Sequence, residues 1–240
     1  MADKKDDVYA KPLNHIVDFA FDQKVVDAFP DMIRRSVPGY ESIISTLGLI
    51  AEAHYQPDST IYDLGCSLGA ATLSVHSRLG NKVSEYICVD SSPEMVQRCT
   101  QNLEKAMPGA NWTVHNGVLQ ETELKQASVV ILNFTLQFIS PESRLSVLTK
   151  IYREMLTGGV LILSEKVQVN ENSCIPKLHS AFKKANGYSD LEISQKRTAL
   201  ENIMKIDAQQ THIQRLQDAG FGHCEKWFQN LNFCSYLAVK

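Results

Sequence analysis

The chain has 240 residues, and its formal net charge is −3. Its 44% of hydrophobic and 21% of charged residues are typical of a globular protein with a buried core. The slightly acidic balance disfavours direct binding of nucleic acid, and no apolar run approaches the roughly 18 residues that a membrane span needs. The six cysteines show no CxxC pair and no Cys/His metal spacing. We therefore expect reduced thiols, no metal site and a cytoplasmic location.

The N-terminal part of the sequence is predicted to be helical after a short charged segment. The first eight residues are mostly charged, and we expect them to be mobile. No apolar signal-peptide segment follows them. Residues 20–55 have helical periodicity, which we expect to be interrupted at Pro30 and again within 36–40.

From residue 59 onwards, short β-rich runs alternate with longer helical ones. The predicted strands are residues 59–64, 84–90, 111–115, 127–134 and 159–165, and the predicted helices between them are 69–80, 92–106 and 141–156. We expect residues 156–159 to close the last of these helices before the fifth strand. The alternation indicates an α/β fold with a doubly wound, mostly parallel sheet and right-handed crossovers.

The last third of the chain departs from this alternation. We interpret residues 171–206 as a polar helical cap inserted after the fifth strand, followed by a helix at 207–219. Strands at 223–229 and 232–239 are predicted to form a hairpin on the sheet edge, which makes seven strands in all. We see no linker and no repeat, so we expect one domain over residues 1–240.

The most informative stretch is Asp-Leu-Gly-Cys-Ser-Leu-Gly-Ala at residues 63–70. It joins a predicted strand to a helix N-terminus, where backbone N–H groups point at a ligand. Gly65 and Gly69 have no Cβ, so a bulky ligand can approach the backbone closely. An acid at the strand end, Asp63, suits a cationic ligand. This combination favours S-adenosylmethionine over a dinucleotide, whose pyrophosphate needs no carboxylate beside it.

Two other interpretations of this turn stay open at this point. Residues 65–69 also match G-x-S-x-G, the nucleophile elbow of α/β-hydrolases, and a strand–helix turn can exist without any ligand. A hydrolase needs an acid and then a histidine after the nucleophile. The late histidines His212 and His223 do not lie in a recognisable loop after a core strand, which disfavours this alternative.

Polar residues at later strand ends supply further candidates for the cofactor site. Asp90 lies 27 residues after Asp63 and can accept hydrogen bonds from a ribose diol, although Asp-Ser-Ser-Pro is also good turn chemistry. Asn133 is predicted to face the methionine end of the cofactor, or else to bond locally to backbone. Backbone N–H groups of Val118 and Leu119 can serve adenine, but Val118 stands where many such domains place an acid.

These residues, with the segment 133–138, resemble class I S-adenosylmethionine-dependent methyltransferases, which have a Rossmann-like fold. More specifically, blocks scattered over most of the chain resemble the family of bacterial carboxy-S-adenosyl-L-methionine synthases. The blocks are residues 29–33, 36–40, 62–72, 133–138, 163–166 and 185–197.

The resemblance implies an enzyme that converts S-adenosylmethionine and prephenate into carboxy-S-adenosylmethionine and phenylpyruvate. It also implies a homodimer, whose product supplies a carboxymethyl donor for modification of wobble uridine in tRNA. Carried over by position, it assigns Arg197 to the carboxylate of the product. The residues that it assigns to the nucleoside are Tyr40, Gly65, Cys66, Ser67, Asp90, Ser91, Val118, Leu119 and Asn133.

Plainer interpretations of these residues remain. Arg197 lies on a polar helix, where an exposed salt bridge is the ordinary expectation. Several cations, including Arg34, Lys183 and Lys196, can attract dianionic prephenate or can be solvated helix faces. The alternative functions are an ordinary small-molecule methyltransferase and a non-catalytic protein that binds the nucleoside.

Overall fold

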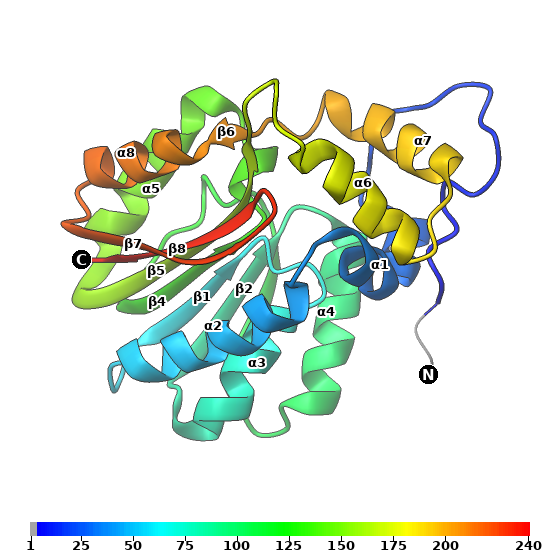
Figure 1. Ribbon diagram of the computed structural model, residues 1–240. Coiled ribbons are helices and arrows are strands. Elements are labelled where there is room, and N and C mark those ends of the chain that lie inside the picture. The colour runs from blue at the N-terminus through cyan, green and yellow to red at the C-terminus, as the bar shows by residue number, and fades with distance from the viewer. Residues whose placement is uncertain (1–3) are drawn as a thin grey trace.

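The computed structural model describes residues 4–240 and is built around one twisted sheet (Figure 1). Its strands follow the order β3-β2-β1-β4-β5-β8-β7, and the two-residue strand β6 pairs with β5 outside this path. The first five strands pair in parallel, and β8 runs antiparallel to both β5 and β7. This confirms the predicted doubly wound, mostly parallel, seven-stranded sheet. The strands are β1 (Thr60–Leu64), β2 (Glu85–Asp90), β3 (Trp112–Asn116), β4 (Ala127–Asn133), β5 (Met155–Gln168), β6 (Asp207–Ala208), β7 (His223–Asn230) and β8 (Phe233–Val239).

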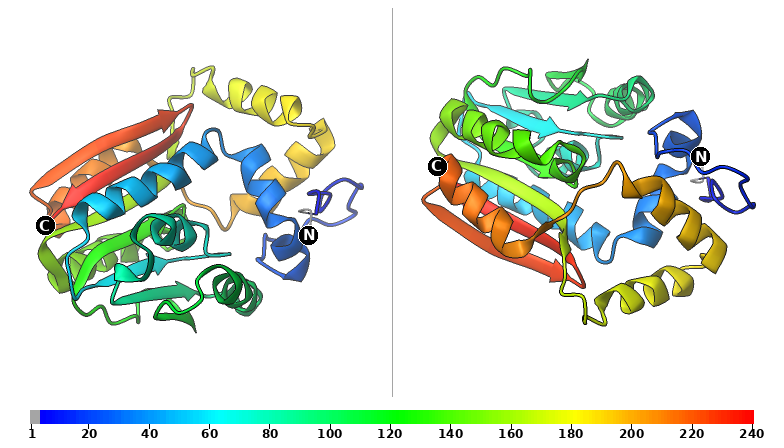
Figure 2. Two further views of the ribbon diagram at one scale, coloured as in Figure 1. Left: turned by 90° about the horizontal axis from the view of Figure 1, so that it is seen from below. Right: turned by 90° about the horizontal axis from the view of Figure 1, so that it is seen from above.

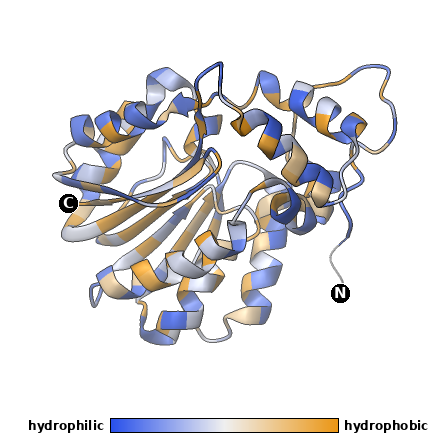
Figure 3. Ribbon diagram, viewed as in Figure 1, coloured by the Kyte–Doolittle hydropathy of each residue, from blue (hydrophilic) through white to orange (hydrophobic). Residues whose placement is uncertain are grey.

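Helices cover both faces of the sheet and the carboxyl ends of its parallel strands (Figures 1 and 2). The strands are rich in hydrophobic residues, as the hydropathy colouring shows (Figure 3). Their apolar side chains are buried between the two helical layers. One layer consists of α2 (Tyr40–His54), α3 (Ala70–Leu79) and α4 (Pro93–Ala106), and the other of α5 (Pro141–Glu154) and α8 (Gln209–Ala219). Over the strand ends lie α1 (Gln23–Ser36), α6 (Ile175–Ala185) and α7 (Asp190–Glu201). Short 3₁₀ turns, η1 (Gly80–Lys82) and η2 (Leu136–Phe138), complete the fold. Within residues 4–240, none of these helices is both long and apolar enough to cross a lipid bilayer.

The N-terminal helices differ from the prediction at Pro30. Helix α1 continues through Pro30, so the predicted interruption there is wrong, whereas the break between Ser36 and Tyr40 is confirmed. Proline removes one backbone donor from a helix. The helix nevertheless buries an apolar face that includes Val25 and Met32, and such packing supplies most of the stability of helices in proteins.

The fifth strand is longer than predicted. Helix α5 ends at Glu154, two residues before the predicted end, and residues 156–159, which we expected to close it, belong to β5. The pairing with β4 shifts register here: Met155 lies opposite Ala127, and Val160 lies opposite Val129. The extra residues therefore form an irregularity in the strand, with Gly158 at a φ of 78°. Glycine is common at helix ends and also at such bulges, which explains the error.

Part of the N-terminal segment is fixed against the helices over the strand ends. Residues 1–3 lie outside the described residues, but Asp6 is buried, contrary to the mobility expected for this segment. Its backbone N–H donates to Asp31 at 2.7 Å, and its carboxylate accepts from the hydroxyl of Tyr188 and lies 3.7 Å from Nζ of Lys196. The segment thus connects α1 to the predicted cap, in which α6 and α7 lie.

A buried arginine holds together three segments near the strand ends. Arg144 of α5 is fully buried, and its Nη1 donates to Asp207. Its Nη2 donates to the carbonyls of Ile139 at 2.9 Å and Lys205 at 2.7 Å. The guanidinium thus joins α5 to the turn after β4 and to the chain that returns from the cap. A buried charge is tolerated only when it is paired and hydrogen-bonded in this way.

We predict that Arg144→Met destabilises the protein by about 3–5 kcal/mol, because it leaves backbone carbonyls and a carboxylate without their donor. Urea unfolding measures the change in free energy. The matched control is Arg153→Met on the same helix, where the arginine is exposed. The control is expected to change stability by no more than about 0.5 kcal/mol. Equal stability of the two variants would contradict the structural role of Arg144.

Candidate functional site

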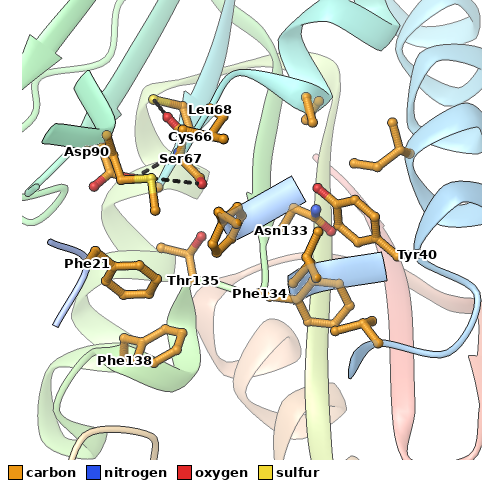
Figure 4. A pocket seen from close by; sticks show the side chains of 18 of the residues that line it. Phe21, Tyr40, Cys66, Ser67, Leu68, Asp90, Asn133, Phe134, Thr135 and Phe138 are labelled. Carbon is orange, nitrogen blue, oxygen red and sulfur yellow. Dashed lines mark hydrogen bonds between the residues drawn. The ribbon is translucent and has the colours of Figure 1, made fainter. Parts of the chain in front are cut away.

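A cavity of about 870 Å³ opens at the carboxyl ends of the parallel strands, beneath α1, α6 and α7 (Figure 4). This is the edge at which open α/β sheets bind their ligands. Most of the residues predicted from the sequence line this cavity: Tyr40, Asp63, Gly65, Cys66, Ser67, Asp90, Ser91, Val118, Leu119 and Asn133. The predicted Arg197 does not line it. The structure therefore brings the strand-end candidates together, and their roles toward a ligand stay predictions.

The glycine-rich turn between β1 and α3 is shaped by close contacts within the protein. Gly65 has a φ of 81°, and a Cβ added to it would lie 2.3 Å from the side chain of Thr135. Ser67 is also left-handed, with a φ of 49°, and its N–H donates to Asp90 at 2.9 Å. Gly65 is thus required by its left-handed backbone, which glycine in this turn already indicated, and by Thr135, a contact that the sequence did not reveal.

The carboxylate of Asp63 lies beneath the first turn of α3. Its Oδ2 accepts from the hydroxyl of Thr72 at 2.7 Å and from the backbone N–H of Thr72 at 3.2 Å. Burial raises the pKa of Asp63 to about 7, and the nearby Cys88 and Asp90 add to this effect. A cationic ligand beside Asp63 would favour its ionised form, because an opposite charge lowers the pKa of a carboxyl group. The position fits the acid expected near a sulfonium or ammonium group.

Asp90 organises the end of β2. Its Oδ1 accepts from the N–H of Ser92 at 2.9 Å, which is the turn geometry expected of Asp-Ser-Ser-Pro, and its Oδ2 accepts from Ser67. Burial raises the pKa of Asp90 despite these hydrogen bonds. A carboxylate has about four acceptor sites, so both oxygens keep capacity for a ribose diol. The turn and the binding role are therefore compatible.

Asn133, at the end of β4, lies near Tyr40 in the cavity (Figure 4). Its Oδ1 is buried and has no hydrogen-bond partner within residues 4–240. Buried polar atoms are nearly always paired, so an unpaired acceptor inside a cavity points to a ligand that supplies a donor. The local backbone bond considered as an alternative is absent at this oxygen. Burial raises the pKa of Tyr40, which keeps its hydroxyl protonated and able to donate.

An aromatic cluster, which the sequence analysis did not assign to the site, closes the other end of the cavity. Phe21 contacts Phe19, Phe29 and Phe138 edge to face, with ring centroids 5.1–6.2 Å apart. All four rings line the cavity, and Phe21 and Phe138 are labelled in Figure 4. Phenylalanines before α1 carry no local signal of a site, because they also fit the apolar face of a helix.

A second group in the cavity is basic, and the sequence analysis considered only some of its members as candidates for the site. Lys166 of β5 and His179 of α6 line the cavity, together with Lys183 and Lys196. Arg197 is exposed, and its Nη2 is 3.4 Å from Oγ of Ser180 on the neighbouring helix. The sequence analysis considered Lys183 and Lys196 for a cleft that attracts prephenate, and both line the cavity. It missed Lys166 and His179, because the approach of β5 to α6 and α7 depends on the fold.

Three buried thiols lie behind the glycine-rich turn. The Sγ atoms of Cys66, Cys88 and Cys99 are all within 4.8 Å of one another. The sequence spacing showed no metal pattern because each thiol comes from a different element: the turn, β2 and α4. A group of this kind can hold a soft metal ion. The described residues provide no further His, Cys or acidic ligand to this group.

A sheet of this topology, with a glycine turn after β1 and polar residues at the ends of β2 and β4, is a Rossmann-like fold of the methyltransferase type. A methyltransferase-domain family model matches residues 61–159, from β1 into β5. An O-methyltransferase family protein from Burkholderia thailandensis has a similar fold, with a TM-score of 0.67 and 17% identity. The match covers 91% of this chain and 60% of that one. Human N-acetylserotonin methyltransferase has a similar fold as well, with a TM-score of 0.61 and 17% identity. That match covers 90% of this chain and 55% of the human protein.

Relatives with much higher sequence identity than these solved structures identify the family. The chain is 49% identical to the carboxy-S-adenosyl-L-methionine synthase of Geobacter sp. strain M21, over the full length of both proteins. It is 47% identical to the synthase of Shewanella putrefaciens, again over the full length of both proteins. It is 48% identical to the synthase of Vibrio parahaemolyticus, over 98% of this chain and 97% of that protein. The chain therefore belongs to the carboxy-S-adenosyl-L-methionine synthase family. This confirms the resemblance inferred from the sequence.

We predict that Gly65→Ala weakens S-adenosylmethionine binding at least tenfold and destabilises the fold by about 1–3 kcal/mol, since the new Cβ meets Thr135 and the backbone is left-handed. Titration calorimetry and urea unfolding measure the two effects. The control is Gly222→Ala, where the new Cβ has nothing within 4 Å. Wild-type binding by the Gly65 variant would show that the turn tolerates a side chain.

Proposed function

We propose that this chain converts S-adenosylmethionine and prephenate into carboxy-S-adenosylmethionine and phenylpyruvate. The observation that carries the proposal is the similarity over the full chain to the carboxy-S-adenosyl-L-methionine synthases, at 47–49% identity. The resemblance further implies a cytoplasmic enzyme, whose product supplies the carboxymethyl group for wobble uridine in tRNA.

The strand-end residues support a specific placement of the nucleoside. Asp90 accepts from the ribose diol, and the backbone at Val118 and Leu119 meets adenine. The methionine end then reaches Asn133, whose free Oδ1 accepts from the ammonium group. Asp63 provides a carboxylate on the same side of the cavity as the cationic cofactor. Tyr40, Cys66, Ser67 and Ser91 complete the wall around the cofactor.

The chemistry needs little from the protein beyond binding and exclusion of water. In prephenate, the bond from the ring to its carboxylate breaks and its electron pair enters the ring, which becomes aromatic as the hydroxyl leaves as hydroxide. The hydroxide removes a proton from the sulfonium methyl, giving water and an ylide. The ylide carbon then attacks the released CO₂, and a carboxymethyl sulfonium forms. A dry cavity protects the ylide from reprotonation and keeps CO₂ beside it.

Arg197 is proposed to bind the new carboxylate, because a guanidinium holds a carboxylate through two parallel hydrogen bonds. In the structure it is exposed at the edge of α7, outside the lining of the cavity. Burial lowers the pKa of Lys166, and the charge of Arg197 adds to this effect, so the guanidinium lies close to the basic side of the site. The family resemblance also leads us to propose a homodimer.

The first test incubates the purified protein with S-adenosylmethionine and prephenate and identifies the nucleoside by mass spectrometry. We expect a product heavier by one CO₂ only when prephenate is present. Arg197→Ala is expected to lose at least tenfold in affinity for the carboxylated product, with S-adenosylmethionine binding unchanged. Arg153→Ala, which removes an exposed arginine from α5, is the control. Unchanged cofactor with active, ligand-competent protein would overturn the proposed reaction.

A second test addresses the homodimer. Sedimentation equilibrium at micromolar concentration is expected to give twice the chain mass of 26.9 kDa. A monomer over the whole concentration range, with full activity, would contradict the proposed assembly.

A further inference from the structure

The cavity carries opposite charges on its two sides. Asp63 and Asp90 lie at the ends of β1 and β2, whereas Lys166 and Lys183 reach the cavity from β5 and α6. The acidic side suits the sulfonium and ammonium groups of the cofactor. The basic side remains without an assigned partner, although it belongs to the same cavity.

Among the described residues, two of the lysines on the basic side have no counter-charge. Lys196 lies 3.7 Å from Asp6 and donates to Oγ of Ser36 at 3.1 Å, so its charge is balanced within the protein. For Nζ of Lys166 and of Lys183, residues 4–240 provide neither a carboxylate nor a hydrogen-bond acceptor. Within the described part of the chain, these two ammonium groups are therefore cations of the cavity wall without a partner.

Keeping these cations together costs free energy unless an anion is bound between them. Burial lowers the pKa of Lys183 to about 7, and the charges of Lys196, Lys166 and Arg197 add to this effect. Burial also lowers the pKa of Lys166, and the charge of Arg197 adds to this effect. Like charges in a partly desolvated wall are stabilised only by an anion, so the wall is already arranged for an anionic ligand.

An aromatic surface adjoins the two lysines. The ring of Phe233 lies 5.0 Å from the imidazole of His179 and 6.0 Å from Phe134, centroid to centroid, and Nζ of Lys166 is 5.9 Å from its centre. All of these residues line the cavity. Burial lowers the pKa of His179 to about 3, so its ring is neutral and can pack against a flat, unsaturated ring. The surroundings thus favour an anion that carries such a ring.

We propose that Lys166 and Lys183 bind the carboxylate of the pyruvyl side chain of prephenate and that Phe233 and His179 pack against its ring. This inference rests on the proposed function. The two lysines hold the carboxylate that prephenate keeps, because a cation on the carboxylate lost as CO₂ would stabilise the ground state and slow the reaction. Phenylpyruvate keeps the same carboxylate and an aromatic ring, so it binds the same subsite.

The test measures phenylpyruvate binding by calorimetry with S-adenosylmethionine present, together with KM for prephenate. Lys166→Met and Lys183→Met are each expected to weaken phenylpyruvate binding and to raise KM by about tenfold or more, as for the loss of a charged hydrogen bond. Lys166→Arg and Lys183→Arg keep the charge and are expected to recover part of the loss. The control is Lys184→Met on the same helix, where the lysine is half exposed and pairs with Asp190 at 2.6 Å.

The pH dependence gives a readout that a structural role would not produce. An anion raises the pKa of Lys183, so wild-type protein takes up protons when phenylpyruvate binds above pH 7, and affinity falls as the pH rises. Lys166, Lys196, Arg197 and His179 face Lys183, and all are retained in Lys183→Met. This variant is therefore expected to lose most of the proton uptake, measured by calorimetry in two buffers of different ionisation enthalpy.

Three outcomes would overturn the subsite. They are phenylpyruvate affinities of the folded methionine variants within twofold of wild type, equal proton uptake in wild type and Lys183→Met, and a loss confined to S-adenosylmethionine affinity. The last would assign the lysines to the cofactor carboxylate. Failure of the proposed function is distinguishable, because it shows as absence of the carboxylated product from wild-type protein, whatever the binding of phenylpyruvate.

Discussion

The buried guanidinium of Arg144 is the interaction on which the geometry of the site depends. It reaches the turn after β4, where Asn133 and Thr135 face the cavity, and the segment that leads from α7 to β6. The turn after β4 also receives a hydrogen bond from the other side, because the buried Glu165 accepts from the N–H of Leu136 at 2.8 Å. A buried guanidinium and a buried carboxyl group therefore position one short segment. The cofactor side of the cavity and the return from the cap share this support.

The cavity separates charge in a way that suits two ligands of opposite sign. Carboxylates at the ends of β1 and β2 favour the sulfonium nucleoside, and cations from β5, α6 and α7 favour an anion. Neutralising these groups against each other inside the protein would be more stable, but it would leave no attraction for either ligand. The lysines without a counter-charge thus lower the stability of the folded protein and raise its affinity for an anion. Such a cost in stability is common at functional sites.

The basic side is formed by segments that are remote in sequence and connected through the N-terminal residues. Asp6 contacts Asp31 on α1, Tyr188 before α7 and Lys196 within α7. Arg35 of α1 stacks on the ring of Tyr188 at 3.9 Å and donates to the carbonyl of Asn186 at 2.6 Å. The position of α7 relative to the sheet is consequently coupled to α1 and to the chain before it. Arg197 shares this helix, so its placement depends on the same contacts.

The sequence alone determined the parallel sheet, most strand positions and the strand-end residues that line one side of the cavity. These features follow local rules: β-branched runs form strands, right-handed crossovers place their carboxyl ends on one edge, and polar residues directly after strands therefore converge. The family was also visible in blocks such as residues 62–72 and 185–197. Only the tertiary structure decided the path of α1 through Pro30, the bulge at the start of β5, the burial of Asp6, the group of three thiols and the place of Lys166 and His179 in the basic wall. Each of these depends on contacts between distant segments, and neither spacing nor propensity carries information about such contacts.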